Sequence, residues 1–205
     1  MSRTSVAAWC RGVCLFVAIA LIGLTADLLT KDWAFDKLGM PGEFRALIEP
    51  ELNATYWVWE DVFGFQTTLN PGALFGIGAG QITFLVTFSL IFLVGIIIYV
   101  LGCAWRSLLL SAIFGMMVAG ICGNLYDRLG WHELVFPVGH PAAGEQIYAV
   151  RDWILCVIWT PLGPFHWPNF NIADCLLVCS VIILLVDAFL FNRPSVGRVG
   201  PEPAA

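Results

Sequence analysis

Two polar residues at the head of the last apolar segment are the first candidates for chemistry. Asn171 and Asp174 lie three residues apart where an apolar run begins that continues to about Phe191. On a helix, residues at this spacing share one face. An acid in a helix long enough to cross a bilayer is costly, so Asp174 is expected to have a partner or a function. A second carboxyl close to Asp174 would share one proton with it, since two such groups cannot both ionise.

Two further motifs could bring polar groups to Asp174 from other helices. Asp27 and Lys31 are spaced i,i+4 and can pair on one helix face, while Asn124, Asp127 and Arg128 share a face at i, i+3 and i+4. Each motif also has a plain structural interpretation, which is an ion pair at the end of a helix. Spacing alone leaves both interpretations open.

The remaining polar candidates lie in loops. Asn70 opens an Asn-Pro-Gly sequence, which is typical of a turn, and its spacing does not show whether it points at a site. Asp152 lies in the middle of residues 147–159, an apolar segment that is too short and too charged for a membrane span and that favours a strand. The histidines have no metal-ligand spacing, so no metal site is expected: His132, His140 and His166.

The composition indicates an integral membrane protein. Of 205 residues, 59 % are hydrophobic and 12 % are charged, whereas soluble domains carry about 25 % charged residues. The net charge of −5 argues against a nucleic-acid partner. The seven cysteines form no CxxC motif and are interpreted as small apolar packing residues.

Apolar segments predict a single membrane domain over residues 1–192. The first run resembles a secretory signal peptide but continues past a possible cleavage site, so it is expected to remain as the first span. Four spans are predicted at about 13–30, 82–101, 107–126 and 171–191, with long loops at 31–80 and 127–170 and a disordered tail at 193–205.

Basic residues predict the orientation of these spans. Arginines are denser at the two termini and in the turn near Arg106 than in the long loops. The positive-inside rule therefore places both termini in the cytoplasm and both long loops outside. All of the polar motifs above then gather at the extracytoplasmic ends of the spans.

Taken together, the motifs resemble those of the bacterial lipoprotein signal peptidase (signal peptidase II) family. They occur in the family's order and at the same places relative to four spans, over about residues 13–191. The matching stretches are Asp27-Leu-Leu-Thr-Lys31, Asn70-Pro-Gly-Ala-Leu-Phe-Gly76, Gly123-Asn-Leu-Tyr-Asp-Arg128, Val150-Arg-Asp-Trp153 and Phe170-Asn-Ile-Ala-Asp174.

The resemblance implies a fold and an activity. The fold would be a mainly α membrane protein with four transmembrane helices, a small extracytoplasmic β-cradle and a surface helix. The activity would be that of an aspartic endopeptidase of the bacterial inner membrane. It would remove the signal peptide from diacylglyceryl-modified prolipoproteins, cutting before the lipidated cysteine. It would need no cofactor, contact membrane lipids and act as a monomer.

The resemblance also assigns roles to residues. Asp152 and Asp174 match the catalytic pair, in which one carboxylate activates water and the other carboxyl holds the shared proton. Asp174 lies in the first turn of its helix, where the helix dipole favours the charged form, so Asp152 is expected to hold the proton more often. The residues that match supporting or substrate-binding positions are Asp27, Lys31, Asn70, Asn124, Asp127, Arg128 and Asn171.

Two features depart from the family pattern. The loop between Arg128 and Asp152 is longer than expected, and Arg151 stands where an aliphatic residue is expected. Neighbouring residues on a strand point to opposite faces, so Arg151 is expected to point away from Asp152. Asp127 remains the rival for the second catalytic acid.

Three other functions remain as alternatives. The first is a catalytically inactive lipoprotein-binding membrane protein, and only the arginine before Asp152 hints at it. The second is a transporter, which would place polar residues deep within several spans. The third is a different intramembrane aspartyl peptidase, which would need two acids in the middle of its helices. The sequence offers neither arrangement.

Overall fold

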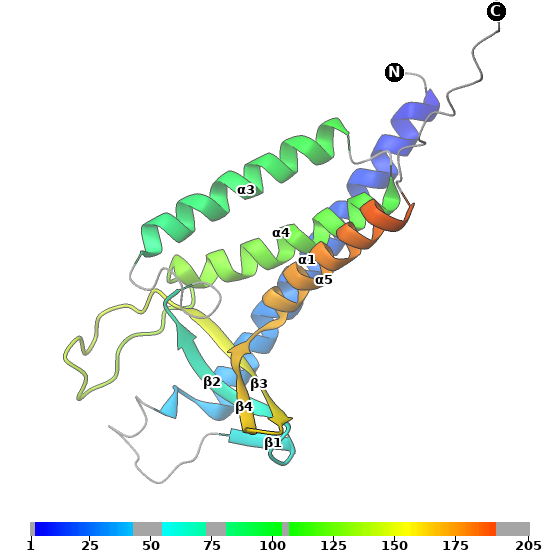
Figure 1. Cartoon of the computed structure of the whole chain (residues 1–205). Coiled ribbons are helices and arrows are strands. Elements are labelled where there is room, and N and C mark those ends of the chain that lie inside the picture. The colour runs from blue at the N-terminus through cyan, green and yellow to red at the C-terminus, as the bar shows by residue number, and fades with distance from the viewer. Residues whose placement is uncertain (1–2, 43–54, 73–80, 104–106, 192–205) are drawn as a thin grey trace, which may run out of the picture.

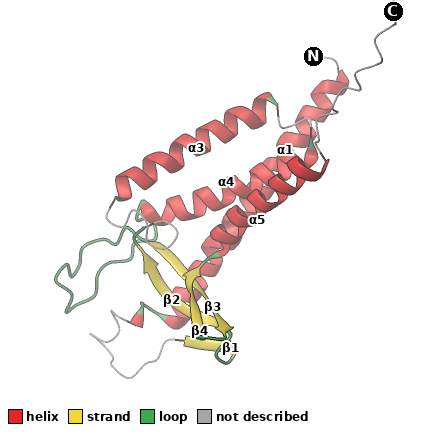
Figure 2. Ribbon diagram, in the orientation of Figure 1, coloured by secondary structure: helices red, strands yellow, loops and turns green. Residues whose placement is uncertain are grey.

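A computed structural model describes residues 3–42, 55–72, 81–103 and 107–191 (Figure 1). The described helices are α1 (Arg3–Leu38), α3 (Ile82–Gly102), α4 (Leu108–Arg128) and α5 (Ile172–Val186), the last followed by a π-helical turn (Asp187–Phe191). The described strands are β1 (Thr55–Trp59), β2 (Phe63–Asn70), β3 (Val150–Thr160) and β4 (Gly163–Phe170). The strands form one sheet at one end of the helices (Figure 2).

The four helices are long and apolar enough to cross a membrane, which confirms the predicted number of spans. Helix α4 contacts each of the other three. Its small residues make this possible: a Cβ on Gly115 would lie 2.8 Å from the carbonyl oxygen of Phe16 in α1. A Cβ on Gly120 would lie 2.5 Å from the carbonyl oxygen of Ala173 in α5. The small residues of this span therefore let the backbones approach closely.

Helix α1 is longer than the sequence predicted. The expected span ended near residue 30 and was followed by a loop, whereas the helix runs to Leu38 over 36 residues. At 1.5 Å per residue this is about 54 Å, well beyond the apolar thickness of a bilayer. Charged residues end the apolar segment here but not the helix, because Ala34 and Phe35 are buried against the sheet. The predicted C-terminal tail, residues 193–205, lies outside the described residues.

The sheet is antiparallel with the order β1-β2-β3-β4. Its third strand, β3, confirms the strand predicted within residues 147–159. Asp152 on β3 lies opposite Thr68 on β2, and the ladder between β2 and β3 is irregular just before this pair. Trp153 and Ile154 of β3 join the buried cluster that fastens the sheet to the end of α1.

The sheet and the helices meet at Asn171. Strand β4 ends at Phe170, and α5 begins at Ile172 with Asn171 as its N-cap. The sheet therefore continues directly into a membrane-spanning helix, and residues at this junction are placed by both.

Candidate active site

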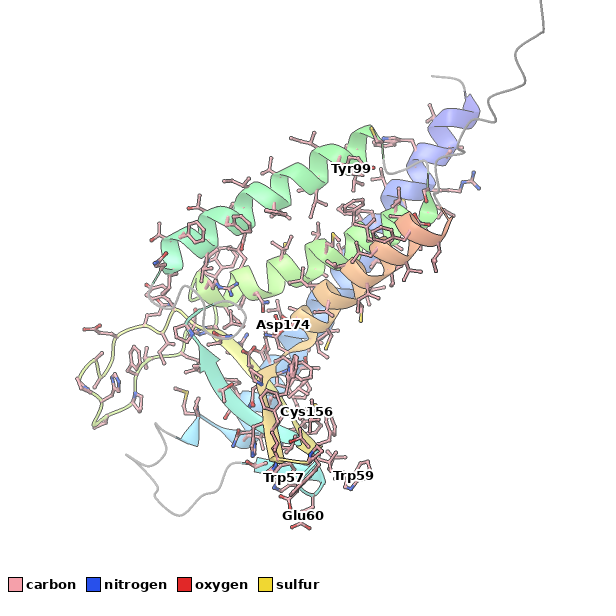
Figure 3. All side chains as sticks on the ribbon, in the orientation of Figure 1. Trp57, Trp59, Glu60, Tyr99, Cys156 and Asp174 are labelled. Atoms are coloured by element: carbon pink, nitrogen blue, oxygen red, sulfur yellow. The ribbon has the colours of Figure 1, made fainter. Side chains whose placement is uncertain are left out.

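Asp174 lies at the start of α5, near the place where the sheet and the helices meet (Figure 3). The Asn171 side chain accepts a hydrogen bond from the Asp174 backbone N–H at 3.0 Å, and Asp174 Oδ2 accepts one from the Asn171 N–H at 3.2 Å. This reciprocal pair is a capping box, which satisfies two free backbone donors and orients the carboxyl group. Asp174 is only partly buried, in contrast to Asn171 beside it.

Asp152 is held by two asparagines at the adjoining end of β3. It is 2 % exposed, and its oxygens accept hydrogen bonds from Asn171 Nδ2 at 2.6 Å and from Asn70 Nδ2 at 3.2 Å. Asn70 is itself fixed by its turn, since its Oδ1 accepts from the Gly72 N–H at 3.0 Å. The Asn70 side chain therefore both stabilises the turn predicted at Asn-Pro-Gly and binds Asp152. The rest of that motif, residues 73–76, lies outside the described part.

A third asparagine, Asn124, connects the acids to the helix bundle. Asn124 Nδ2 donates to Asp174 Oδ1 at 2.8 Å, and Asn124 Oδ1 accepts from Asn171 Nδ2 at 3.1 Å. The same oxygen accepts from Lys31 Nζ at 3.3 Å. Asp152 and Asp174 are therefore joined through Asn171. Each also accepts a hydrogen bond from a further asparagine, which is Asn70 for Asp152 and Asn124 for Asp174.

The surroundings of Asp152 change its ionisation. Burial, together with the nearby Asp174 carboxylate, raises the pKa of Asp152 from its ordinary 3.8 to about 8. The amides of Asn70 and Asn171 and the charge of Lys31 oppose this shift only in part. With a pKa of about 8, the Asp152 carboxyl is mostly protonated at pH 7, and a protonated carboxyl beside a second carboxyl is the arrangement that aspartic peptidases use.

The charged residues behind the acids form a buried network. Lys31 lies 2.7 Å from Asp27 and 3.0 Å from Asp127, and all three side chains have an exposed fraction of 0 %. Asp27 also accepts from the Ala173 N–H at 2.8 Å, which satisfies a free donor in the first turn of α5. The predicted Asp27–Lys31 ion pair is therefore confirmed, but it is fully buried and belongs to a larger network instead of standing alone at the end of a helix.

Asp127 is occupied by cations from two other elements. Its oxygens lie 3.0 Å from Lys31 Nζ and 3.0 Å from Arg151 Nε. The proposed local pair between Asp127 and Arg128 is thus wrong. Arg128 instead donates to the Gly72 carbonyl at 2.9 Å and braces the Asn70 turn. As predicted from the strand, Arg151 points away from Asp152.

The structure brings every sequence-predicted site residue into one connected group. One further member was missed: Asp32, whose carboxylate lies 2.6 Å from Arg151 Nη1. Its signal was weak, because it lies directly after Lys31 in a segment interpreted as a loop. Among the described residues no group of three metal-ligating side chains occurs, and the seven cysteines, all within the described ranges, are free.

A family model for signal peptidase (SPase) II matches residues 19–190. The chain belongs to the signal peptidase II family. A lipoprotein signal peptidase from Rhodopirellula baltica is 39 % identical over 178 residues, which are 85 % of this chain and 71 % of that protein. One from Rhodococcus jostii is 32 % identical over 94 % of this chain and 80 % of that protein.

The fold is likewise shared. A solved structure of a bacterial membrane enzyme superposes with a TM-score of 0.63 at 22 % identity, covering 89 % of this chain and 93 % of that one. As a member of the signal peptidase II family, the protein is an aspartic peptidase and a multi-pass bacterial membrane protein.

Proposed function

We propose that Asp152 and Asp174 are the catalytic pair, and that this peptidase removes signal peptides from diacylglyceryl-modified prolipoproteins. The observation that supports this pairing best is their connection through Asn171, combined with a pKa of about 8 for Asp152. Asp127 does not fit as a member, because Lys31 and Arg151 already engage both of its oxygens.

The chemistry follows from one shared proton. The Asp174 carboxylate takes a proton from a water molecule, whose oxygen attacks the scissile carbonyl carbon. The neutral Asp152 carboxyl donates a hydrogen bond to the carbonyl oxygen and stabilises the charge that develops there. When the tetrahedral intermediate collapses, the proton on Asp174 passes to the leaving amine, and the carbon–nitrogen bond breaks. The pair then returns to its starting state with one proton.

The site lies where a lipid-anchored substrate can reach it. The acids and their partners come from one end of α1, α4 and α5 and from the adjoining sheet. With both termini in the cytoplasm, as the basic residues favour, this end lies at the extracytoplasmic boundary. The acyl chains of a diacylglyceryl substrate would stay in the bilayer while the peptide enters from the side. We expect a monomer to be active.

Cleavage of a diacylglyceryl-modified prolipoprotein peptide by the purified protein in detergent tests this function. Wild type should cut before the lipidated cysteine, and an unlipidated peptide should be a poor substrate. Asp152→Asn and Asp174→Asn should each abolish turnover, while Asp36→Asn, an exposed acid on α1, should leave it unchanged.

Each result has a defined meaning. Activity in Asp152→Asn together with inactivity in a folded Asp127→Asn would show that the pair is wrongly assigned. Equal cleavage of lipidated and unlipidated peptides would refute the lateral-entry argument. A folded wild type that binds the peptide without cutting it would favour the inactive lipoprotein-binding alternative.

A further inference from the structure

Arg151 connects the strand of Asp152 to two helices. Its side chain is 4 % exposed, and it donates from Nε to Asp127 Oδ1 at 3.0 Å and from Nη1 to Asp32 Oδ1 at 2.6 Å. Strand pairing uses backbone groups only, so neither contact is needed to form the sheet. The guanidinium therefore ties β3 to α4 and to α1.

The backbone of Arg151 is held by the same carboxylate. Its N–H donates to Asp127 Oδ2 at 3.0 Å, and that oxygen also lies 3.0 Å from Lys31 Nζ. One carboxylate thus binds both the backbone and the side chain of Arg151. The residue cannot rotate or slide along α4 without breaking both hydrogen bonds. This fixes the direction in which the chain enters Asp152.

The sheet holds Asp152 from one side only, because Val150, Arg151 and Asp152 pair with β2 but not with β4. The register between β2 and β3 shifts between Phe65 and Thr68, directly before the Thr68–Asp152 pair. On the other side, the first paired residue of β3 is Ile154, opposite Phe170, so Asp152 lies beyond the ladder with β4. Its remaining contacts are hydrogen bonds from two neutral amides, which are weaker than the charge-assisted bonds of Arg151.

We infer that Arg151 is a positioning residue, which holds the Asp152 carboxyl where it can act with Asp174 by clamping β3 to Asp127 and Asp32. The inference rests on the proposed function, because it assumes that Asp152 and Asp174 are the catalytic pair. The side chain points away from the acids, so it acts through the backbone and not on the substrate. Displacement of a catalytic group by about 1 Å can lower the rate by about 10²-fold.

The test compares kcat and KM on the lipidated peptide with the thermal unfolding temperature of each variant. Arg151→Met keeps the length of the side chain and removes the clamp, so kcat should fall by about 10²-fold while KM stays within about twofold. Arg151→Lys keeps a charge near Asp127 but loses the planar donors, and should recover part of kcat. Asp32→Asn should lose about tenfold or less, since it weakens only the exposed end of the clamp.

Arg11→Met provides the matched control, because Arg11 is exposed on α1 outside the site. It should behave as wild type. A wild-type kcat in folded Arg151→Met would overturn the inference, whether or not its unfolding temperature falls, since the residue would then only stabilise the fold. A raised KM at unchanged kcat would overturn it too.

Two variants decide the matter if Arg151→Met does not fold. Arg151→Lys and Asp32→Asn must then lower kcat at an unchanged unfolding temperature, and a wild-type kcat in both would overturn the inference. Absence of cleavage by folded wild type would refute the proposed function and this inference together. Loss of kcat in Arg151→Met with an active wild type would support the inference about Arg151.

Discussion

Replacement of Lys31 by methionine should be among the most destabilising single changes in this protein. The ammonium lies 2.7 Å from Asp27, 3.0 Å from Asp127 and 3.3 Å from Asn124 Oδ1, and the side chain is fully buried. Methionine fills similar space, so the change removes charge with little change in packing. Removing one partner of a buried ion pair costs about 3–5 kcal/mol, because the other partner stays buried without compensation.

Asp27 is the group that would be left without a cation. Asp127 keeps Arg151, whereas Asp27 keeps only the Ala173 N–H. Adding Asp27→Asn to Lys31→Met should therefore recover part of the loss, with a coupling of about 0.5–3 kcal/mol.

Thermal unfolding in detergent provides the assay. For a chain of this size, 1 kcal/mol lowers Tm by about 2–4 °C, so Lys31→Met should unfold about 6–20 °C below wild type. Lys37→Met is the matched control, because Lys37 is exposed near the end of the same helix, and it should change Tm little. Equal Tm values for Lys31→Met and Lys37→Met would refute the argument that loss of Lys31 leaves the buried Asp27 carboxylate without a compensating cation. Strict additivity in the double variant would refute the coupling to Asp27.

Two further predictions concern ionisation and packing. The pKa of Asp152 is raised from 3.8 to about 8 in the folded state. Between about pH 4 and 8 the folded state therefore keeps a proton that the unfolded state has already released. Rising pH therefore destabilises the fold over this window. The Tm of Asp152→Asn minus that of wild type should increase from pH 4 to 8, and a constant Tm difference would contradict the raised pKa of Asp152. Gly123→Ala should lower both Tm and kcat, because its Cβ would clash with the Asp27 carboxylate and lie 3.2 Å from Ala173 Cβ. Gly95→Ala, with no atom within 4 Å of its Cβ, should change neither, and equal effects of the two substitutions would show that close packing at Gly123 is unimportant.

The helices and the polar motifs were accessible from sequence for different reasons. Apolar length alone predicts the spans, because the bilayer sets a minimum length for each. Helical spacing predicts that Asn171 and Asp174 share a face, but not that the two form a capping box. The pairing of Asp152 with Asp174 rests on the family resemblance, because no local pattern relates a residue on a strand to one on a helix 22 positions later.

Other features depend on contacts that local patterns do not encode. Charged residues after Lys31 suggested the end of α1, yet Ala34 and Phe35 continue the helix because the sheet covers them. Arg151 was flagged as a departure from the family pattern, but its partner Asp32 lies 119 positions away in the chain. Such a pair becomes visible only when α1 and β3 are placed together.

The choice of asparagine at position 171 follows from the number of groups it must serve. Its Oδ1 accepts from the Asp174 N–H, while its Nδ2 donates to Asp152 and to Asn124. Aspartate caps helices equally well, but it would add a third carboxyl group beside those of Asp152 and Asp174. Serine also caps well, but it has a single donor on a shorter side chain. Only an amide offers an acceptor for the helix end together with two donors for its neighbours, so the cap that begins α5 also fixes the distance between the two acids.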